Sequence, residues 1–300
     1  MKSYQRIFLF FLFVLFVNCL ISPWLAALWE LIIDTRAEWT SYRQPFSRIF
    51  GRTYIALGIV LFFCFRSRLK IGSLTELGLG RPRRCHEVAL GFALAVASIF
   101  AVIAALTFAD IFTPDWRRSL ASSLGRAFAA LMTGLTVGCL EEIFFRGIIF
   151  KGLMEDTKPL TAFVVANLFY AAIHFVKPAE EAPLSGIDPF AGFKFLAASF
   201  APFLDTREIL PGLLGLFLVG VVLSYACLRT GALYLSIGLH AGWIFGLQTL
   251  TMFGRYQRRD LGWFFGASEP KIVSGVATWI GILAVLAVVH WVTRTRESNR

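Results

Sequence analysis

The sequence predicts an all-α integral membrane protein, a polytopic helical bundle with about eight transmembrane helices. The first observation is composition. Of 300 residues, 57% are apolar, 16% are charged and 31 are Phe, and the mean hydropathy is +0.68, values far from those of soluble domains. The second is pattern, because the apolar residues form long runs separated by short charged segments. The net charge of +10 therefore indicates loops that orient the protein in a membrane and not nucleic-acid binding.

The runs are long enough to cross a bilayer as helices, which takes about 20 predominantly apolar residues. The predicted spans cover residues 7–33, 49–65, 88–108, 121–152, 160–176, 210–228, 232–253 and 272–292.

The first two spans need separate justification. Lys2 and Arg6 precede the first run, as in a signal peptide, but the run is too long and has no small-residue cleavage site. We therefore expect an uncleaved span, kinked near Pro23. The second span is the weakest because Arg52 lies within it.

The later loops complete the prediction. Residues 177–208 are rich in proline and acidic side chains, and we expect a loop with a piece lying in the membrane interface. The short connection at 229–231 forces spans six and seven into an antiparallel hairpin. The predicted parts of the chain are two N-terminal spans in 1–70, a catalytic core in 71–255, and a last span with a basic tail in 256–300.

The basic loops also predict an orientation. With the N-terminus and the C-terminus in the cytoplasm, the dense basic loop at 66–84 lies inside and the acidic loop at 177–208 lies outside. This agrees with the positive-inside bias, from which only the loop at 255–271 departs.

The stretch Glu141-Glu142-Ile-Phe-Phe-Arg146 places three charged residues inside an apolar run, where ionisable groups are costly and are functional candidates. Glu142 and Arg146 are four residues apart, so we expect them to form an ion pair on one helix face. Glu141 points about 100° away, and we expect no such partner for it and a capacity to take or give a proton. The alternative is that all three residues only join helices.

Depth estimates bring two histidines to the same level. At about 1.5 Å per residue, Glu141, His174 and His240 lie roughly 16, 21 and 14 Å below the inner face, so they can converge. A carboxylate and two imidazoles suit activation of water, and they can instead hold zinc with an open fourth position. His86 and His290 we interpret as structural, as in helix-to-helix hydrogen bonds.

Three motifs in order carry a resemblance to a known family. Glu141-Glu142-x-x-x-Arg146 is followed by Tyr170-x-x-x-His174 and then by His240-x-x-x-Ile244. These resemble the Glu-Glu-x-x-x-Arg, aromatic-x-x-x-His and His-x-x-x-Asn/Asp motifs of the CPBP intramembrane proteases, also called the Abi or type II CAAX prenyl endopeptidase family. The similarity covers about residues 73–253.

The resemblance implies an intramembrane endopeptidase, with Glu141 as the general base and His174 and His240 binding water or a metal, for which zinc is the candidate. Glu142 and Arg146 then support the site. Ile244 cannot donate a hydrogen bond as the family's Asn or Asp does. Asn167 and Gln248, two turns from His174 and His240, are candidates to replace that donor, and each is also explained as a helix-packing amide.

The resemblance further implies a membrane-associated protein or peptide as substrate, the lipid bilayer as partner, no nucleic acid, and a bacterial cytoplasmic (inner) membrane. Two alternatives stay open. One is a non-catalytic membrane protein that binds peptide in an immunity or assembly role. The other is a proton-coupled transporter, which the lack of an internal repeat disfavours.

Overall fold

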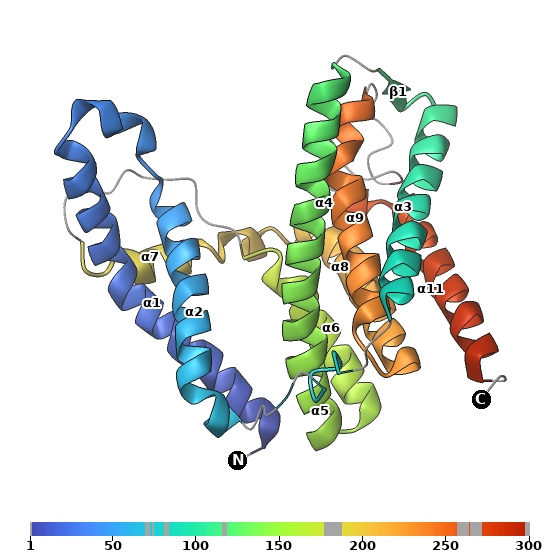
Figure 1. The fold of residues 1–300 in the computed structure, drawn as a ribbon, viewed down its shortest axis with the longest axis horizontal. Helices are drawn as coiled ribbons and strands as arrows, with labels where there is room; N and C mark the ends of the chain where they lie inside the picture. The colour runs from blue at the N-terminus through green and yellow to red at the C-terminus, as the bar shows by residue number, and fades with distance from the viewer. Residues whose placement is uncertain are drawn as a thin grey trace. The chain divides into compact units, whose positions relative to one another are not determined.

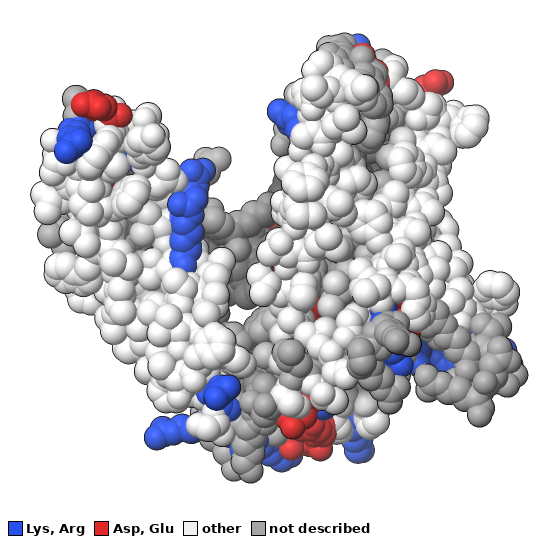
Figure 2. All heavy atoms as spheres, in the orientation of Figure 1, with Lys and Arg blue, Asp and Glu red and all other residues white. Residues whose placement is uncertain are grey.

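The computed structural model describes residues 2–69, 73, 75–80, 84–115, 119–176, 188–256, 264 and 272–297. The all-α class is confirmed. Within the described residues, six helices are long and apolar enough to cross a membrane by length and composition. Their visible flanks carry few charged side chains, which gather mainly towards the helix ends (Figure 2). The chain is thus a polytopic membrane protein.

The helices follow the order of the predicted spans (Figure 1). They are α1 Ser3–Asp34, α2 Phe46–Leu69, α3 Cys85–Phe108, α4 Leu120–Glu142, α5 Lys151–Asp156, α6 Pro159–Ile173, α7 Ala191–Ala198, α8 Thr206–Thr230, α9 Tyr234–Phe253 and α11 Val276–Glu297. Short 3₁₀ turns cover Ala37–Tyr42, Ala201–Leu204 and Ile272–Ser274. A π-helix, Ile143–Phe150, joins α4 to α5. The helix of the fourth span therefore continues to Asp156, beyond the predicted end at residue 152.

The chain divides into two compact units. The first unit consists of residues 1–72 and 173–209, and the second unit of residues 73–172 and 210–300.

Aromatic rings, and a close approach of Gly192 of α7 to the Cys19 backbone of α1, hold the first unit together. α1 packs against α2 and against α7. The ring of Phe195 on α7 lies 4.8 Å from that of Phe50 and 5.3 Å from that of Phe46 on α2. One buried polar contact adds to this, since Asn18 Nδ2 of α1 donates to the Phe50 carbonyl at 3.3 Å. α7 lies inside the predicted 177–208 loop, for which a piece lying in the membrane interface was expected. Apolar residues at 191–198 give the chain a reason to form a packed helix there.

Glycines hold the second unit together. α9 lies between α3 and α4 (Figure 1) and contacts both extensively. A Cβ on Gly238 would lie 2.1 Å from the Val88 carbonyl oxygen of α3, and one on Gly134 of α4 would lie 2.6 Å from the Ala241 carbonyl oxygen. Small residues let apolar helices approach backbone to backbone in this way. α9 is consequently fixed on two sides.

Turns and a small sheet close the second unit. Gly231, at φ +63°, provides the turn between α8 and α9 that the predicted hairpin requires. Two short strands were not predicted: β1 (Phe112–Pro114) pairs antiparallel with β2 (Gly254–Tyr256). They follow α3 and α9, so the sheet joins the ends of two neighbouring helices.

Some predicted features lie outside the described residues. These are residues 70–72, 74 and 81–83 of the basic loop, 177–187 of the acidic loop, 257–263 and 265–271 of the last loop, and the end of the basic tail at 298–300.

Candidate functional site

The site begins where α4 becomes the π-helix. π-Helical turns are rare and are often found at functional positions, and this one starts directly after Glu142. The predicted ion pair is present: Arg146 Nη1 lies 2.8 Å from Glu142 Oε1, and the two side chains are 1% and 0% exposed. Two opposite charges that are this deeply buried need to pair with each other or to form hydrogen bonds with neighbouring polar groups.

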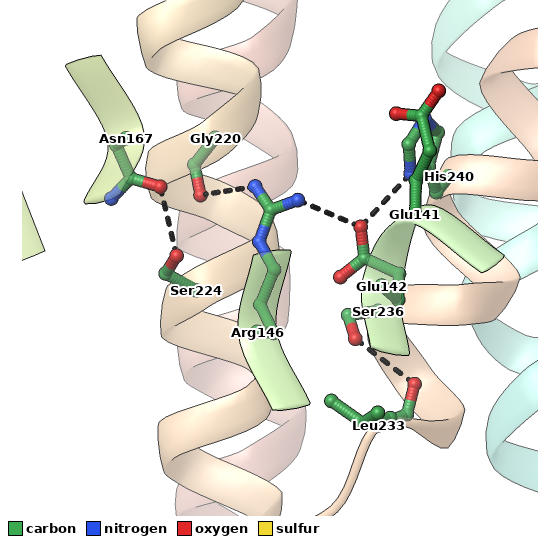
Figure 3. A network of polar contacts seen from close by, with 9 residues as sticks. All are labelled: Glu141, Glu142, Arg146, Asn167, Gly220, Ser224, Leu233, Ser236 and His240. Atoms are coloured by element: carbon green, nitrogen blue, oxygen red, sulfur yellow. Dashed lines mark hydrogen bonds and ion pairs between the residues drawn. The ribbon is translucent and has the colours of Figure 1, made fainter. Parts of the chain in front are cut away.

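Arg146 also contacts residues of α8 and α6 in the second unit. Its Nη2 donates to the Gly220 carbonyl of α8 at 3.2 Å, and its guanidinium carbon lies 4.4 Å above the ring of Tyr170 on α6. A planar guanidinium suits both contacts because it donates in its plane and stacks on its face. Arg146 thereby links the α4 segment to α6 through Tyr170 and to α8 through the bond to Gly220 drawn in Figure 3.

His240 of α9 completes the buried group. Its Nδ1 lies 2.9 Å from Glu142 Oε1. Because a carboxylate paired with Arg146 is ionised and can only accept, Nδ1 must donate. In the neutral imidazole this leaves an unprotonated Nε2 as an acceptor or metal ligand. Glu142 thus fixes which nitrogen of His240 is available.

Glu141 lies on the other side of that imidazole. Its Oε2 is 3.7 Å from His240 Nε2, and its side chain is 30% exposed, whereas that of Glu142 is 0% exposed. The structure thus places Glu141 beside His240 of α9, one of the two histidines that were predicted to converge with it. The separation is too long for a direct hydrogen bond and suits a small species between the two atoms.

His174 does not lie within the predicted helix. α6 ends at Ile173, and His174 occupies the following turn, half-buried, at the start of the segment that belongs to the first unit. Pro178 sets only the latest possible end of this helix, because it disfavours helical geometry at the residue directly before it. As a member of the site, His174 stays a prediction.

The two candidate replacements for the family's Asn or Asp differ in position. Asn167 is buried: its Nδ2 donates to the Phe163 carbonyl at 2.8 Å, and its Oδ1 accepts from Ser224 Oγ of α8 at 2.8 Å. It is a packing amide between α6 and α8 (Figure 3). Gln248 is exposed on α9, and Ile244 is half-buried.

Sequence reasoning missed some members of the network. Gly220 contributes a backbone carbonyl, which no side-chain motif reveals. Ser236 lies one turn before His240, is fully buried, and donates to the Leu233 carbonyl at 2.9 Å. Ser224 and Ser236 are polar residues within apolar runs, and that contrast is the signal that could have found them. His290 bonds Tyr225 Oη across α8 and α11 at 2.5 Å, which confirms its structural role.

The donor set has a limited fit to a metal. Within the described ranges, no group of three or more His, Cys, Asp or Glu side chains is arranged to hold a metal ion. Two donors are suitably prepared: the Glu141 carboxylate, and the Nε2 of His240, whose Nδ1 is held by a carboxylate. A zinc-binding histidine is usually oriented by a carboxylate in this way. Glu141 and His240 thus fit two ligand positions of a zinc site.

Comparison with known proteins agrees with the motifs. Residues 123–246, less than half of the chain, match the sequence model of the type II CAAX prenyl endopeptidase Rce1-like family. The matched segment contains Glu141, Glu142, Arg146, His174 and His240, and it confirms the resemblance found in the sequence. Neither curated proteins nor solved structures gave a significant match.

Proposed function

We propose that the chain is an intramembrane endopeptidase that hydrolyses a peptide bond of a membrane-associated protein or peptide, with water activated by Glu141. The observation that carries this is the contrast between two adjacent carboxylates. Glu142 is fully buried and neutralised by Arg146, whereas the Glu141 side chain is 30% exposed and its buried Oε2 faces His240 Nε2 at 3.7 Å. The Glu142 carboxylate holds Arg146 and His240 in place, and the Glu141 carboxylate is the one that we propose reacts.

The proposed chemistry follows from two hydrogen-bond acceptors that face each other, Glu141 Oε2 and His240 Nε2. A water between Glu141 Oε2 and His240 Nε2 donates a hydrogen to each, so its oxygen lone pairs point away towards a bound carbonyl. Glu141 takes one proton as the oxygen bonds the carbonyl carbon. The same proton then passes to the leaving nitrogen as the carbon–nitrogen bond breaks, which yields a carboxylic acid and an amine. His174 is the further partner that we assign to the oxyanion or the water.

Zinc is the proposed alternative means of activation. Glu141, His240 and His174 would hold it, and when bound it would act as a Lewis acid towards water and carbonyl oxygen. Elemental analysis of purified protein, compared with His240→Ala and His174→Ala, tests this. About one zinc per chain that is lost in both variants supports it, and zinc retained in either variant contradicts the ligand set.

The substrate and the membrane are part of the proposal. The family name indicates a prenylated C-terminal CAAX peptide, and this is the substrate that we assign first. We assign both termini to the cytoplasm of a bacterial inner membrane. Lys2 and Arg6 at the start of α1 and Arg66 and Arg68 at the end of α2 agree with the positive-inside bias. Green fluorescent protein fused to the C-terminus should fluoresce, and a dark fusion would contradict this orientation.

The test of function is the substitution Glu141→Gln in the full chain. The probe is a fluorogenic peptide that ends in a farnesylated CAAX sequence, presented in detergent micelles. Loss of a general base should lower the cleavage rate about 100-fold or more. Glu155→Gln is the matched control, because Glu155 is an exposed carboxylate further along the same helical segment.

Two outcomes would contradict the proposal. Undiminished cleavage by Glu141→Gln would remove Glu141 as the base. Binding of the peptide without any cleaved product from the wild-type protein would favour the non-catalytic peptide-binding protein instead.

A further inference from the structure

The contact of one ring with several site residues points to a positioning role. Tyr170 of α6 is 2% exposed. Its ring face lies under the Arg146 guanidinium at 4.4 Å, and its ring lies edge-on to the His240 imidazole, with centroids 6.1 Å apart and an interplanar angle of 81°. One side chain therefore touches both groups that bind Glu142.

The ring has little freedom to move. Phe145, on the π-helical segment, packs against it at 90° with centroids 5.0 Å apart. On the α8 side, even a Cβ on Gly220 would lie 3.1 Å from Tyr170 Cδ1, so the absence of a side chain at Gly220 makes room for the ring. Packing on two sides fixes the orientation of the Tyr170 ring, so Arg146 and His240 contact a surface that does not move.

We propose that Tyr170 is a positioning residue, whose ring holds Arg146 and His240 at the angle at which both bind the same oxygen of Glu142. A buried guanidinium on an aromatic face gains from the cation–π interaction. Without the ring face, the Arg146 side chain can turn away from Glu142. The His240 imidazole also loses the ring against which it packs. The bond from Nδ1 to Glu142 then no longer selects one tautomer, and Nε2 no longer faces Glu141 consistently. The role in catalysis rests on the proposed function, whereas the role in fixing the tautomer does not.

The structural test is ¹⁵N NMR of the full chain labelled at histidine, in detergent micelles. The chain has four histidines, and the His240 signals are assigned by their loss in His240→Gln. The wild-type protein should show an Nδ1-protonated His240. Tyr170→Leu should give a mixture of both tautomers, and Tyr170→Phe should give the wild-type signals because it keeps the ring.

The matched control is Tyr225→Leu. Tyr225 also packs against a histidine, His290, with centroids 6.1 Å apart, but it is not part of the Glu142 network. This variant should change the signals of His290 and leave those of His240 as they are. Wild-type signals for His240 in Tyr170→Leu would overturn the proposal, and so would equal effects of Tyr170→Phe and Tyr170→Leu, because the hydroxyl and not the ring would then be responsible.

A second variant covers the case in which Tyr170→Leu does not fold. Arg146→Lys keeps the charge but has no planar face to rest on the ring, and it should produce the same mixture of His240 tautomers. An unchanged His240 in this variant would overturn the proposal equally.

The kinetic test uses the farnesylated CAAX probe. Tyr170→Leu should lower kcat about 10-fold to 100-fold through misplacement of the site and change KM less than twofold, with Tyr170→Phe restoring most of the rate. An equal effect on kcat and KM would contradict positioning of the reacting groups. If the wild-type protein does not cleave the probe, the proposed function fails, and the NMR comparison still decides the role of Tyr170.

Discussion

The two units of the chain differ in how many glycines bring their helices into backbone contact. In the second unit, glycines bring the backbones of α3, α4 and α9 into contact. In the first unit, one described glycine, Gly192 of α7, approaches the Cys19 backbone of α1 in this way, and aromatic rings lie between α2 and α7. A backbone contact fixes the position of a helix, whereas ring contacts tolerate small adjustments of side-chain angle. In the site, the position of His240 relative to Glu142 must be kept to within about 0.5 Å. Backbone contacts between helices are better suited to this than ring contacts.

The units also differ in the surroundings of their ion pairs. Arg146–Glu142 in the second unit and Lys194–Asp188 in the first unit have the same nitrogen–oxygen distance, 2.8 Å. The side chains of the former pair are 1% and 0% exposed, and those of the latter are 73% and 32% exposed. Water and salt screen the exposed pair. The distance within an ion pair therefore does not by itself determine how much the pair contributes to stability. From this comparison we predict losses of stability that decrease from the buried pair to the exposed pair.

The largest effect should come from breaking the buried pair. Glu142→Leu leaves the Arg146 charge buried and without its carboxylate, and it removes the acceptor for His240 Nδ1. We expect a loss of about 3–5 kcal/mol in the free energy of unfolding, as for other broken buried pairs. Denaturant unfolding of the full chain in detergent, followed by circular dichroism, measures it.

Removing both charges is the control for this prediction. Glu142→Leu combined with Arg146→Leu should recover much of the lost stability, since a buried pair replaced by apolar residues is often tolerated. Cleavage should not recover, because His240 still lacks its partner. A double variant as unstable as the single variant would mean that shape, and not the uncompensated charge, accounts for the loss.

A smaller effect should come from the glycine contacts. Gly238→Ala places a Cβ 2.1 Å from the Val88 carbonyl oxygen, so α9 must shift away from α3. Overpacking of this kind costs about 1–3 kcal/mol, and the shift should lower cleavage because His240 lies two residues further along α9. Thermal unfolding and the cleavage rate, measured on the same sample, check both parts.

Gly58→Ala in α2 of the first unit is the matched control. No atom lies within 4 Å of the Cβ that it adds, and alanine is the better helix former by about 0.5–1 kcal/mol. We expect unchanged or slightly raised stability and full cleavage. Equal losses in both variants would contradict the contrast between the units.

Much of the fold could be predicted from the sequence because membrane spans depend on local composition. The ion pair between Glu142 and Arg146 could be predicted too, since its residues are four apart on one segment. Long-range placement could not. Depth indicated that Glu141 and His240 can converge, but no local pattern shows that α9 lies between α3 and α4, the arrangement that brings the two residues together.

Local structure could also not be predicted where several weak conformational preferences compete. The π-helix after Glu142 leaves no clear mark in the sequence, because its residues, Ile143 to Phe150, are apolar apart from Arg146. The predicted span runs to residue 176, and nothing in this apolar run marks the end of α6 at Ile173. The role of Gly220 depends on a backbone oxygen and on the space that a missing side chain leaves for Tyr170. Such features become visible only when the neighbouring helix is known.

The smallest effect should come from the exposed pair of the first unit. Hydrogen bonds from the Lys194 ammonium and the Phe190 backbone N–H hold the pKa of Asp188 below its ordinary value. A carboxyl whose pKa is lower when folded adds stability above the unfolded value, about 3.9, and this stability is lost as the pH falls through the folded value. Asp188→Asn should therefore lower the Tm only slightly at pH 7, and the two proteins should converge in acid. Thermal unfolding at several pH values measures this difference. A loss at pH 7 as large as that of Glu142→Leu would show that exposure does not separate the two pairs.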